Sequence, residues 1–306
     1  MRARAFASAA LAITVLAAPA AQQSSRFTLA IARFDGALVP FAAYDHGRWQ
    51  RAWPAADENV DPTPTLTNMP SVWRERGEDV PRLWHVWPVA GGDRIEARVQ
   101  RVDVVQAQCL RQVALKTDLP PRKPQSPRAF GVAADGEIPL QPIEAVGPAE
   151  PASRSAERAI AAAFDALERT QAAAGEDRLI RESPLPPVHI VSLSREVGAR
   201  SPMYVVARRT YRTSRYPGQR QCGAVSVLTS WLVRDAGSYR LVAPRMFLTD
   251  CDEKTARSAW PRSSLHVGDR VFWVLQEHGF ESEVYAIEEI GAADTRRLVQ
   301  WDAGGC

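Results

Sequence analysis

Residues 222–251 read CGAVSVLTSWLVRDAGSYRLVAPRMFLTDC, two apolar stretches on either side of Asp235-Ala236-Gly237-Ser238. Valine, threonine and aromatic residues favour strands, and a short Gly-containing segment between two such runs favours a turn. We therefore predict an antiparallel hairpin with Ala236-Gly237 as a two-residue loop. Residues that face each other then have numbers that sum to 473, so Trp231 faces Val242.

This register places Cys222 opposite Cys251. Their pair falls in the non-hydrogen-bonded class, in which Cα atoms are about 4.5 Å apart, a separation that a disulfide accepts. A bond there closes a loop of about 30 residues and is worth about 3–4 kcal/mol. The alternative is a three-residue loop with Gly237 as a bulge, which changes the sum to 472 and moves the two cysteines out of direct opposition.

The chain has four cysteines, so Cys109 and Cys306 remain when the hairpin pair is set aside. We assign a second disulfide to Cys109 and Cys306 by subtraction.

Strand patterns continue on both sides of the hairpin, and one segment reads as a helix. From Ser155, a capping residue, to Gly175, the apolar residues Ile160, Phe164 and Leu167 recur on one helical face. The segment Glu253–Trp260 is a second, shorter helical candidate that Pro261 would end. The predicted fold class is mainly β with one amphipathic helix (α+β), in which the helix lies against a sheet.

Two features of the N-terminal half mark turns and a bulge. Asp35-Gly36 and Gly91-Gly92 predict hairpin turns. The apolar alternation changes phase between Val99 and Val102, which indicates a β-bulge or a strand that passes to another surface.

The middle of the chain is rich in proline, with eight prolines between residues 120 and 151. Proline removes a backbone donor, so we expect neither a helix nor a central strand there. Apolar residues such as Phe130 and Ile138 favour a strap that packs on the surface. The expected organisation is two antiparallel β-rich lobes, 27–119 and 153–302, joined by a Pro-rich connector, 120–152.

The first residues have the layout of a secretory signal peptide, residues 1–20. Arg2 and Arg4 precede an uncharged apolar run from Ala5 to Ala18, and Ala18-Pro19-Ala20 has the form of a cleavage site. The alternative is a membrane anchor, but this run is shorter than the roughly 20 residues that a spanning helix needs. We expect cleavage near Ala20, no membrane span afterwards, and a secreted or periplasmic protein in which disulfides form.

The net charge and the absence of known motifs limit which ligands and reactions we expect. The net charge is +3 for the whole chain, and it falls to about +1 without Arg2 and Arg4, so nothing attracts nucleic acid by charge alone. No G-x-S-x-G, H-E-x-x-H, C-x-x-C or phosphate-binding Gly-Lys-Ser/Thr motif occurs. We expect no metal and no cofactor.

Two groups of residues remain as candidate sites. The acidic residues Asp250, Asp252 and Glu277 lie next to predicted turns, and paired carboxylates can act as general acid and base. Solvated turn residues are the plainer interpretation, and we favour it.

The second group consists of tryptophans that share the N-terminal lobe, where an aromatic surface could stack on a ligand. Its members are Trp49, Trp53, Trp84 and Trp87. We favour core packing for them over a ligand surface.

These observations lead to three hypotheses of function. The first is an exported, disulfide-stabilised module that binds an unknown ligand or an envelope component without catalysis. The second is a secreted hydrolase that uses carboxylates near Asp250, Asp252 and Glu277. A third, structural envelope role requires no concave site.

Overall fold

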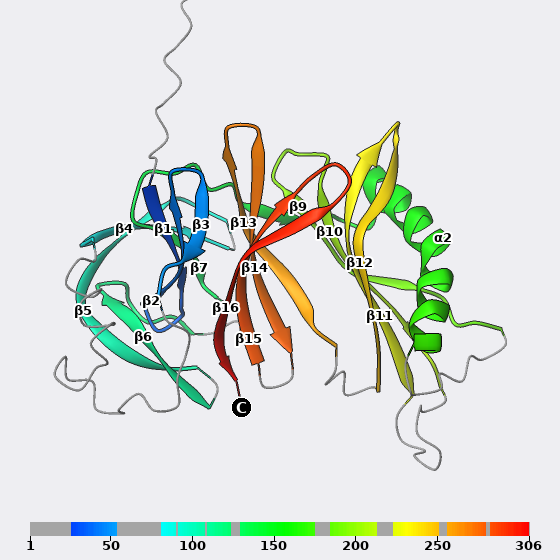
Figure 1. Ribbon diagram of the computed structural model, residues 1–306, viewed down its shortest axis with the longest axis horizontal. Helices are drawn as coiled ribbons and strands as arrows, with labels where there is room; N and C mark the ends of the chain where they lie inside the picture. Colours follow the sequence, from blue (N-terminus) through cyan, green and yellow to red (C-terminus); the bar gives the residue numbers. More distant parts are fainter. Residues whose placement is uncertain are drawn as a thin grey trace, which may run out of the picture.

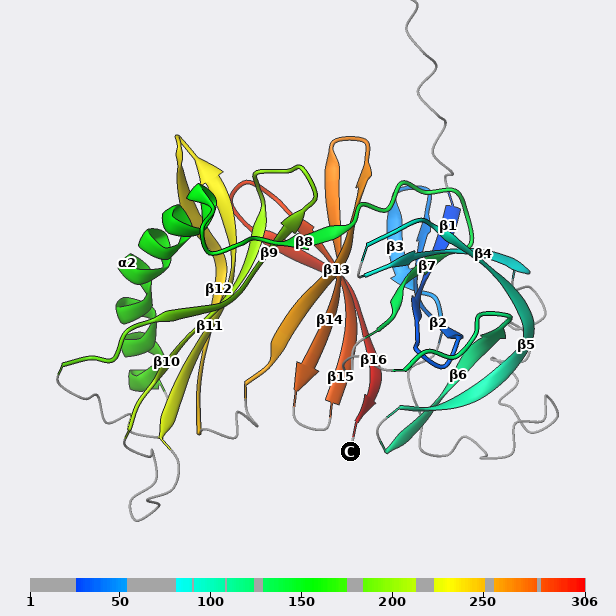
Figure 2. The same ribbon diagram turned by 180° about the vertical axis from the view of Figure 1, so that it is seen from behind.

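A computed structural model describes residues 26–53, 81–89, 91–107, 109–123, 129–174, 184–212, 223–250, 256–279 and 282–305. It has three antiparallel sheets and, among these residues, the single helix α2 (Pro151–Ala174) (Figures 1 and 2). The prediction of a mainly β fold with one helix is confirmed.

The first sheet is barrel-like. Its strands are β1 (Arg26–Ala32), β2 (Ala37–Asp45), β3 (Arg48–Arg51), β4 (Leu83–Pro88), β5 (Ile95–Ala107), β6 (Leu110–Thr117) and β7 (Gly131–Ala134). Their order is β1-β7-β4-β5-β6-β2-β3, and β1 also pairs with β2, which closes the sheet on itself. The bulge expected from the change of phase is confirmed, because the β5–β6 register shifts between Val99 and Arg101.

The other two sheets follow in the C-terminal half. The five-stranded sheet has the order β12-β11-β10-β9-β8, and the four-stranded sheet has the order β13-β14-β15-β16. The strands of the five-stranded sheet are β8 (Ile143–Ala145), β9 (His189–Glu196), β10 (Met203–Thr210), β11 (Ala224–Asp235) and β12 (Ser238–Asp250). Those of the four-stranded sheet are β13 (Ser258–Val267), β14 (Arg270–Gly279), β15 (Ser282–Ile290) and β16 (Thr295–Gly305).

The β11–β12 hairpin has the predicted loop and register near its turn. Ala236 and Gly237 have φ angles of 44° and 90°, and Trp231 faces Val242. Farther out, the register shifts between Thr229 and Trp231, so the ladder ends with Ala224 facing Asp250. The sum there is 474 rather than 473. Cys222 and Cys251 lie outside the described residues.

The sheets and the helix are stacked in layers (Figure 1). At one end, α2 packs on one face of the five-stranded sheet, where Phe164 meets Leu228 and Met203 in a buried cluster. The opposite face of that sheet packs on the four-stranded sheet through side chains such as Trp231 and Trp273. The other face of the four-stranded sheet packs on the outside of the barrel-like sheet. The strands β13–β16 are therefore covered on both faces.

The helix has the predicted inner face but an earlier start. Ile160 and Phe164 are buried and Leu167 is half-buried. The helix begins at Pro151 rather than at Ser155, because proline suits the first turn, where its missing N–H is not needed. Within the described part of the chain, neither this helix nor any other is both long enough and apolar enough for a membrane crossing.

Two local expectations are wrong. Residues 131–134, inside the Pro-rich stretch, form β7, which pairs with β1 on one side and with β4 on the other and is thus a central strand. Residues 258–260, expected at the end of a short helix, begin β13. Pro261 lies within β13 where the register shifts, the kind of position at which a strand tolerates proline.

Candidate functional site

The predicted carboxylate Glu277 lies in a buried ion cluster between the five-stranded and four-stranded sheets. Arg297 of β16 pairs with Glu277 of β14 and, at 3.3 Å, with Oε2 of Glu288 of β15. From the facing sheet, Nη1 of Arg245 lies 3.7 Å from Glu277 Oε1, and the indole N–H of Trp231 donates to Glu288 Oε1 at 3.3 Å. Two carboxylates and two guanidinium groups therefore balance each other.

This cluster has little free space. The gap that Glu277, Glu288, Arg297 and their neighbours enclose amounts to ≈10 Å³, about the room that one water molecule needs. Tyr204 lines the same gap, and burial, reinforced by the nearby carboxylates, raises its pKa to about 12. The arrangement holds two sheets together, and it offers no room for a substrate.

The other two predicted carboxylates are not part of this cluster. Arg245, the residue of β12 that contacts Glu277, precedes Asp250 by five residues, or about 17 Å along an extended strand. The Asp250 side chain and Asp252 lie outside what the structure describes. The position of Glu277 therefore does not support a site in which all three carboxylates converge.

A further carboxylate, outside both predicted groups, has a structural role. Asp135, just after β7, accepts a 2.6 Å hydrogen bond from the backbone N–H of Thr28 in β1. Burial raises the pKa of Asp135, against the lowering effect of this hydrogen bond. The contact ties the ends of two neighbouring strands.

The four tryptophans of the predicted aromatic surface pack into the protein. Trp53 and Trp84 are buried inside the barrel-like sheet, while Trp49 and Trp87 are partly buried against its outer face. The ring of Trp49 lies 5.4 Å from that of Phe272 of β14, and the indole N–H of Trp301 donates to the Trp53 carbonyl at 2.8 Å. The contacts of Trp49 and Trp53 join the barrel-like and four-stranded sheets, as expected for core packing.

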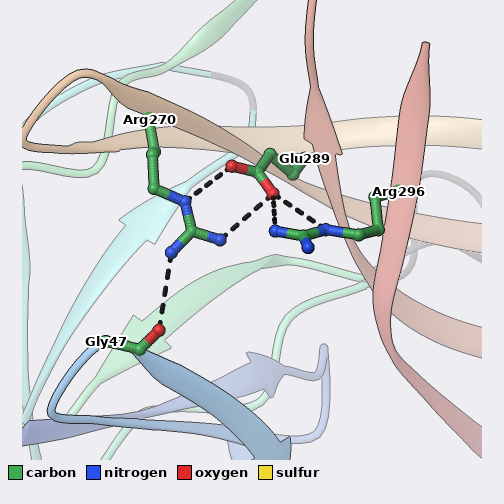
Figure 3. Close-up of polar contacts among 4 residues, drawn as sticks. All are labelled: Gly47, Arg270, Glu289 and Arg296. Atoms are coloured by element: carbon green, nitrogen blue, oxygen red, sulfur yellow. Dashed lines mark hydrogen bonds and ion pairs between the residues drawn. The ribbon is translucent and has the colours of Figure 1, made fainter.

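A second ion cluster lies on the other face of the four-stranded sheet (Figure 3). Arg270 binds both carboxylate oxygens of Glu289, at 2.6 and 3.1 Å, and Arg296 binds one of them at 2.6 Å. These hydrogen bonds, chiefly from Arg270, lower the pKa of Glu289 to about 2. Arg270 also donates to the Gly47 carbonyl at 3.4 Å, so the cluster links β14 to the β2–β3 turn.

A groove between α2 and β9 has the features of a binding site. Its volume is ≈550 Å³, within the range of ligand pockets. The lining is mixed, with apolar side chains on both walls and a few polar groups. It consists of Val146, Pro148, Ser153, Glu157, Ile160, Ala161, Val188, His189, Ile190, Val191, Ser192 and Leu193.

The sequence pattern did not predict this groove. The helix pattern predicted α2 and its buried face, but α2 lies mostly over β12 and β11 and leaves the β9 side of the sheet uncovered. The lateral position of a helix on a sheet depends on the curl of that sheet, which the local pattern does not contain. The sequence holds no signal for it, because Val191 lies among apolar neighbours of a predicted strand and its exposure is visible only in the structure.

The cysteines are placed only in part. Cys109 is disulfide-bonded, and no cysteine of the described residues is free. Its backbone N–H donates to the carbonyl of Gly305 at 3.2 Å. Cys222, Cys251 and Cys306 lie outside the described residues. Across those residues there is no group of three or more His, Cys, Asp or Glu that could hold a metal ion.

Comparison with known proteins adds no relative: no protein family, no curated protein and no solved structure matches this chain.

Proposed function

We propose that this chain is an exported, disulfide-stabilised binding module without catalytic activity, which recognises a ligand or an envelope component. The observation that carries the proposal is the groove between α2 and β9, which is open, of ligand size, and lined by apolar side chains with a few polar ones. The layered core supports it, since it holds both walls of the groove on rigid elements.

Export is the first part of the proposal. It is supported by the leader of residues 1–20 and by the disulfide-bonded state of Cys109. We propose the pairs Cys109–Cys306 and Cys222–Cys251. The contact between Cys109 and Gly305 supports the first pair, because it brings the residue before Cys306 next to Cys109.

Protein recovered from the envelope or the medium should begin near Ala20 and contain both pairs. Mass spectrometry of the intact protein and non-reducing peptide mapping would check this. An intact Met1 terminus on soluble cytosolic protein would contradict export, and free thiols at Cys222 and Cys251 would contradict the hairpin bridge.

A secreted hydrolase that uses Asp250, Asp252 and Glu277 is the alternative. General acid–base catalysis needs a carboxylate that can exchange a proton with a substrate. Glu277 is instead held by Arg245 and Arg297 in a space that has room for about one water molecule. These contacts favour the binding proposal over the hydrolase.

The groove should bind a small amphipathic dye in the folded protein. We expect saturable, one-to-one binding of 8-anilinonaphthalene-1-sulfonate, measured by fluorescence titration. Ala161 and Ala162 are neighbours on α2 and both are exposed, but only Ala161 lines the groove. Ala161→Trp should therefore weaken the binding of the dye by about tenfold, whereas Ala162→Trp should leave its affinity unchanged. Equal effects of the two variants, or no binding to the native protein, would contradict a binding function of this groove.

A further inference from the structure

We infer that the groove between α2 and β9 takes an extended peptide segment of a partner protein, which adds to β9 as a further strand. This inference rests on the proposed binding function and names the class of ligand. In strand addition, main-chain hydrogen bonds supply affinity and pockets for alternate side chains supply specificity. Both elements are present at β9.

The edge of β9 already accepts an extended segment over half of its length. The short strand β8 pairs with it from Ser194 to Glu196, and the Val146 N–H donates to the Leu193 carbonyl at 2.8 Å. The chain then leaves the edge and turns into α2 (Figure 2). Among the described residues, the β8 side of β9 has no strand partner from His189 to Ser192. Such an uncovered edge is a template for pairing with another chain.

The groove lies beside this uncovered half of the edge. Leu193 of β9 and Ile160 of α2 are buried, and Ala161 and Glu157 line the helix wall. An extended peptide points alternate side chains to one side. A segment that continues the line of β8 would therefore direct every second side chain toward the groove.

Val191 indicates that the partner segment is short. The β9–β10 register shifts between Val206 and Ala207, so Val191 is an extra residue in β9, and 56% of it is exposed. A bulge bends the strand locally and limits how far regular pairing can continue. This favours a peptide of a few residues over edge-to-edge pairing of two copies of this sheet.

The test uses a short synthetic peptide of four alternating valine and threonine residues with a lysine at each end. We expect it to bind the full-length oxidised protein in a fluorescence anisotropy assay and to displace the dye. A matched peptide has the same side chains but N-methyl groups on alternate main-chain amides. Because these amides cannot donate, we expect that peptide to bind about tenfold more weakly. Ala161→Trp should weaken the binding of the unmodified peptide, and Ala162→Trp should not.

The outcomes separate this inference from the proposed function. If the dye binds the groove but the peptide does not, the binding function stands and the peptide inference is wrong. Equal binding of the N-methylated peptide would also overturn it, since strand addition requires those amides. Displacement of the dye by dodecanoate and not by the peptide would assign the groove to an acyl chain. A concentration-dependent dimer that Ala161→Trp abolishes would assign it to a second copy of the chain.

Discussion

Replacing Arg297 with methionine should lower the free energy of unfolding by about 3 kcal/mol. The reason is that Glu277 and Glu288, whose side chains are 8% and 4% exposed, would lose the guanidinium group that they share. A buried charge without a partner carries its full desolvation cost. Arg245 still contacts Glu277 in this variant, so we expect the lower end of the range for a broken buried pair. Urea unfolding followed by tryptophan fluorescence measures the change.

The neighbouring arginine provides a matched control. Arg296 is on the same strand and pairs across to Glu289, but its side chain is 64% exposed. Exposed ion pairs contribute about 0–1 kcal/mol, so Arg296→Met should cost at most that much. Adding Glu277→Gln and Glu288→Gln to Arg297→Met should restore part of the lost stability, because the unpaired charges are then removed. Equal costs for the two arginine variants would refute a stabilising role of the buried cluster.

The sequence allowed the β11–β12 hairpin to be predicted because its information is local. A two-residue loop and a period of two fix the register beside the turn, and Trp231 does face Val242. The register then slips by one residue near Ala243, which has a positive φ of 49°. Pro244 follows it and has no N–H to donate to the ladder. The proline was therefore a signal in the sequence that the register would change along the hairpin. The register predicted from the turn holds only beside the turn.

The central strand β7 shows where local reasoning fails. Its four residues lie in a Pro-rich stretch, and their identity as a strand depends on β1 and β4, which come from distant parts of the chain. The predicted grouping of Glu277 with Asp250 and Asp252 has no support for the same reason. Turn proximity grouped Glu277 with Asp250 and Asp252, whereas the packing of two sheets brings Arg245 and Arg297 to it. Contacts between layers depend on tertiary packing that periodicity along one strand does not encode.

The tryptophans show the opposite case, in which a general rule was sufficient. Large aromatic side chains dominate the energetics of cores, so burial was the better expectation for Trp49, Trp53, Trp84 and Trp87. Burial of Trp53 and Trp84 and partial burial of the other two agree with it. Residue type thus predicted the environment of these side chains, although it did not predict which sheets they would join.

Replacing Phe164 with alanine should cost about 4 kcal/mol, because its ring is fully buried between α2 and the five-stranded sheet. The ring also lies 4.9 Å from the guanidinium carbon of Arg209, which itself pairs with Glu168 at 2.8 Å. Arg158→Ala, on the exposed side of the same helix, should change stability by less than about 0.5 kcal/mol.

The measurement also tests whether α2 and the sheets unfold together. Far-UV circular dichroism reports the backbone and tryptophan fluorescence reports the core between the sheets, and the two transitions should coincide if unfolding is two-state. Ile160→Ala, one turn earlier on the buried face, should cost about 2–5 kcal/mol. An unchanged midpoint for Phe164→Ala and Ile160→Ala would contradict the packing of α2 on the sheet. Because α2 forms one wall of the groove, that result would also remove the structural basis of the proposed binding site.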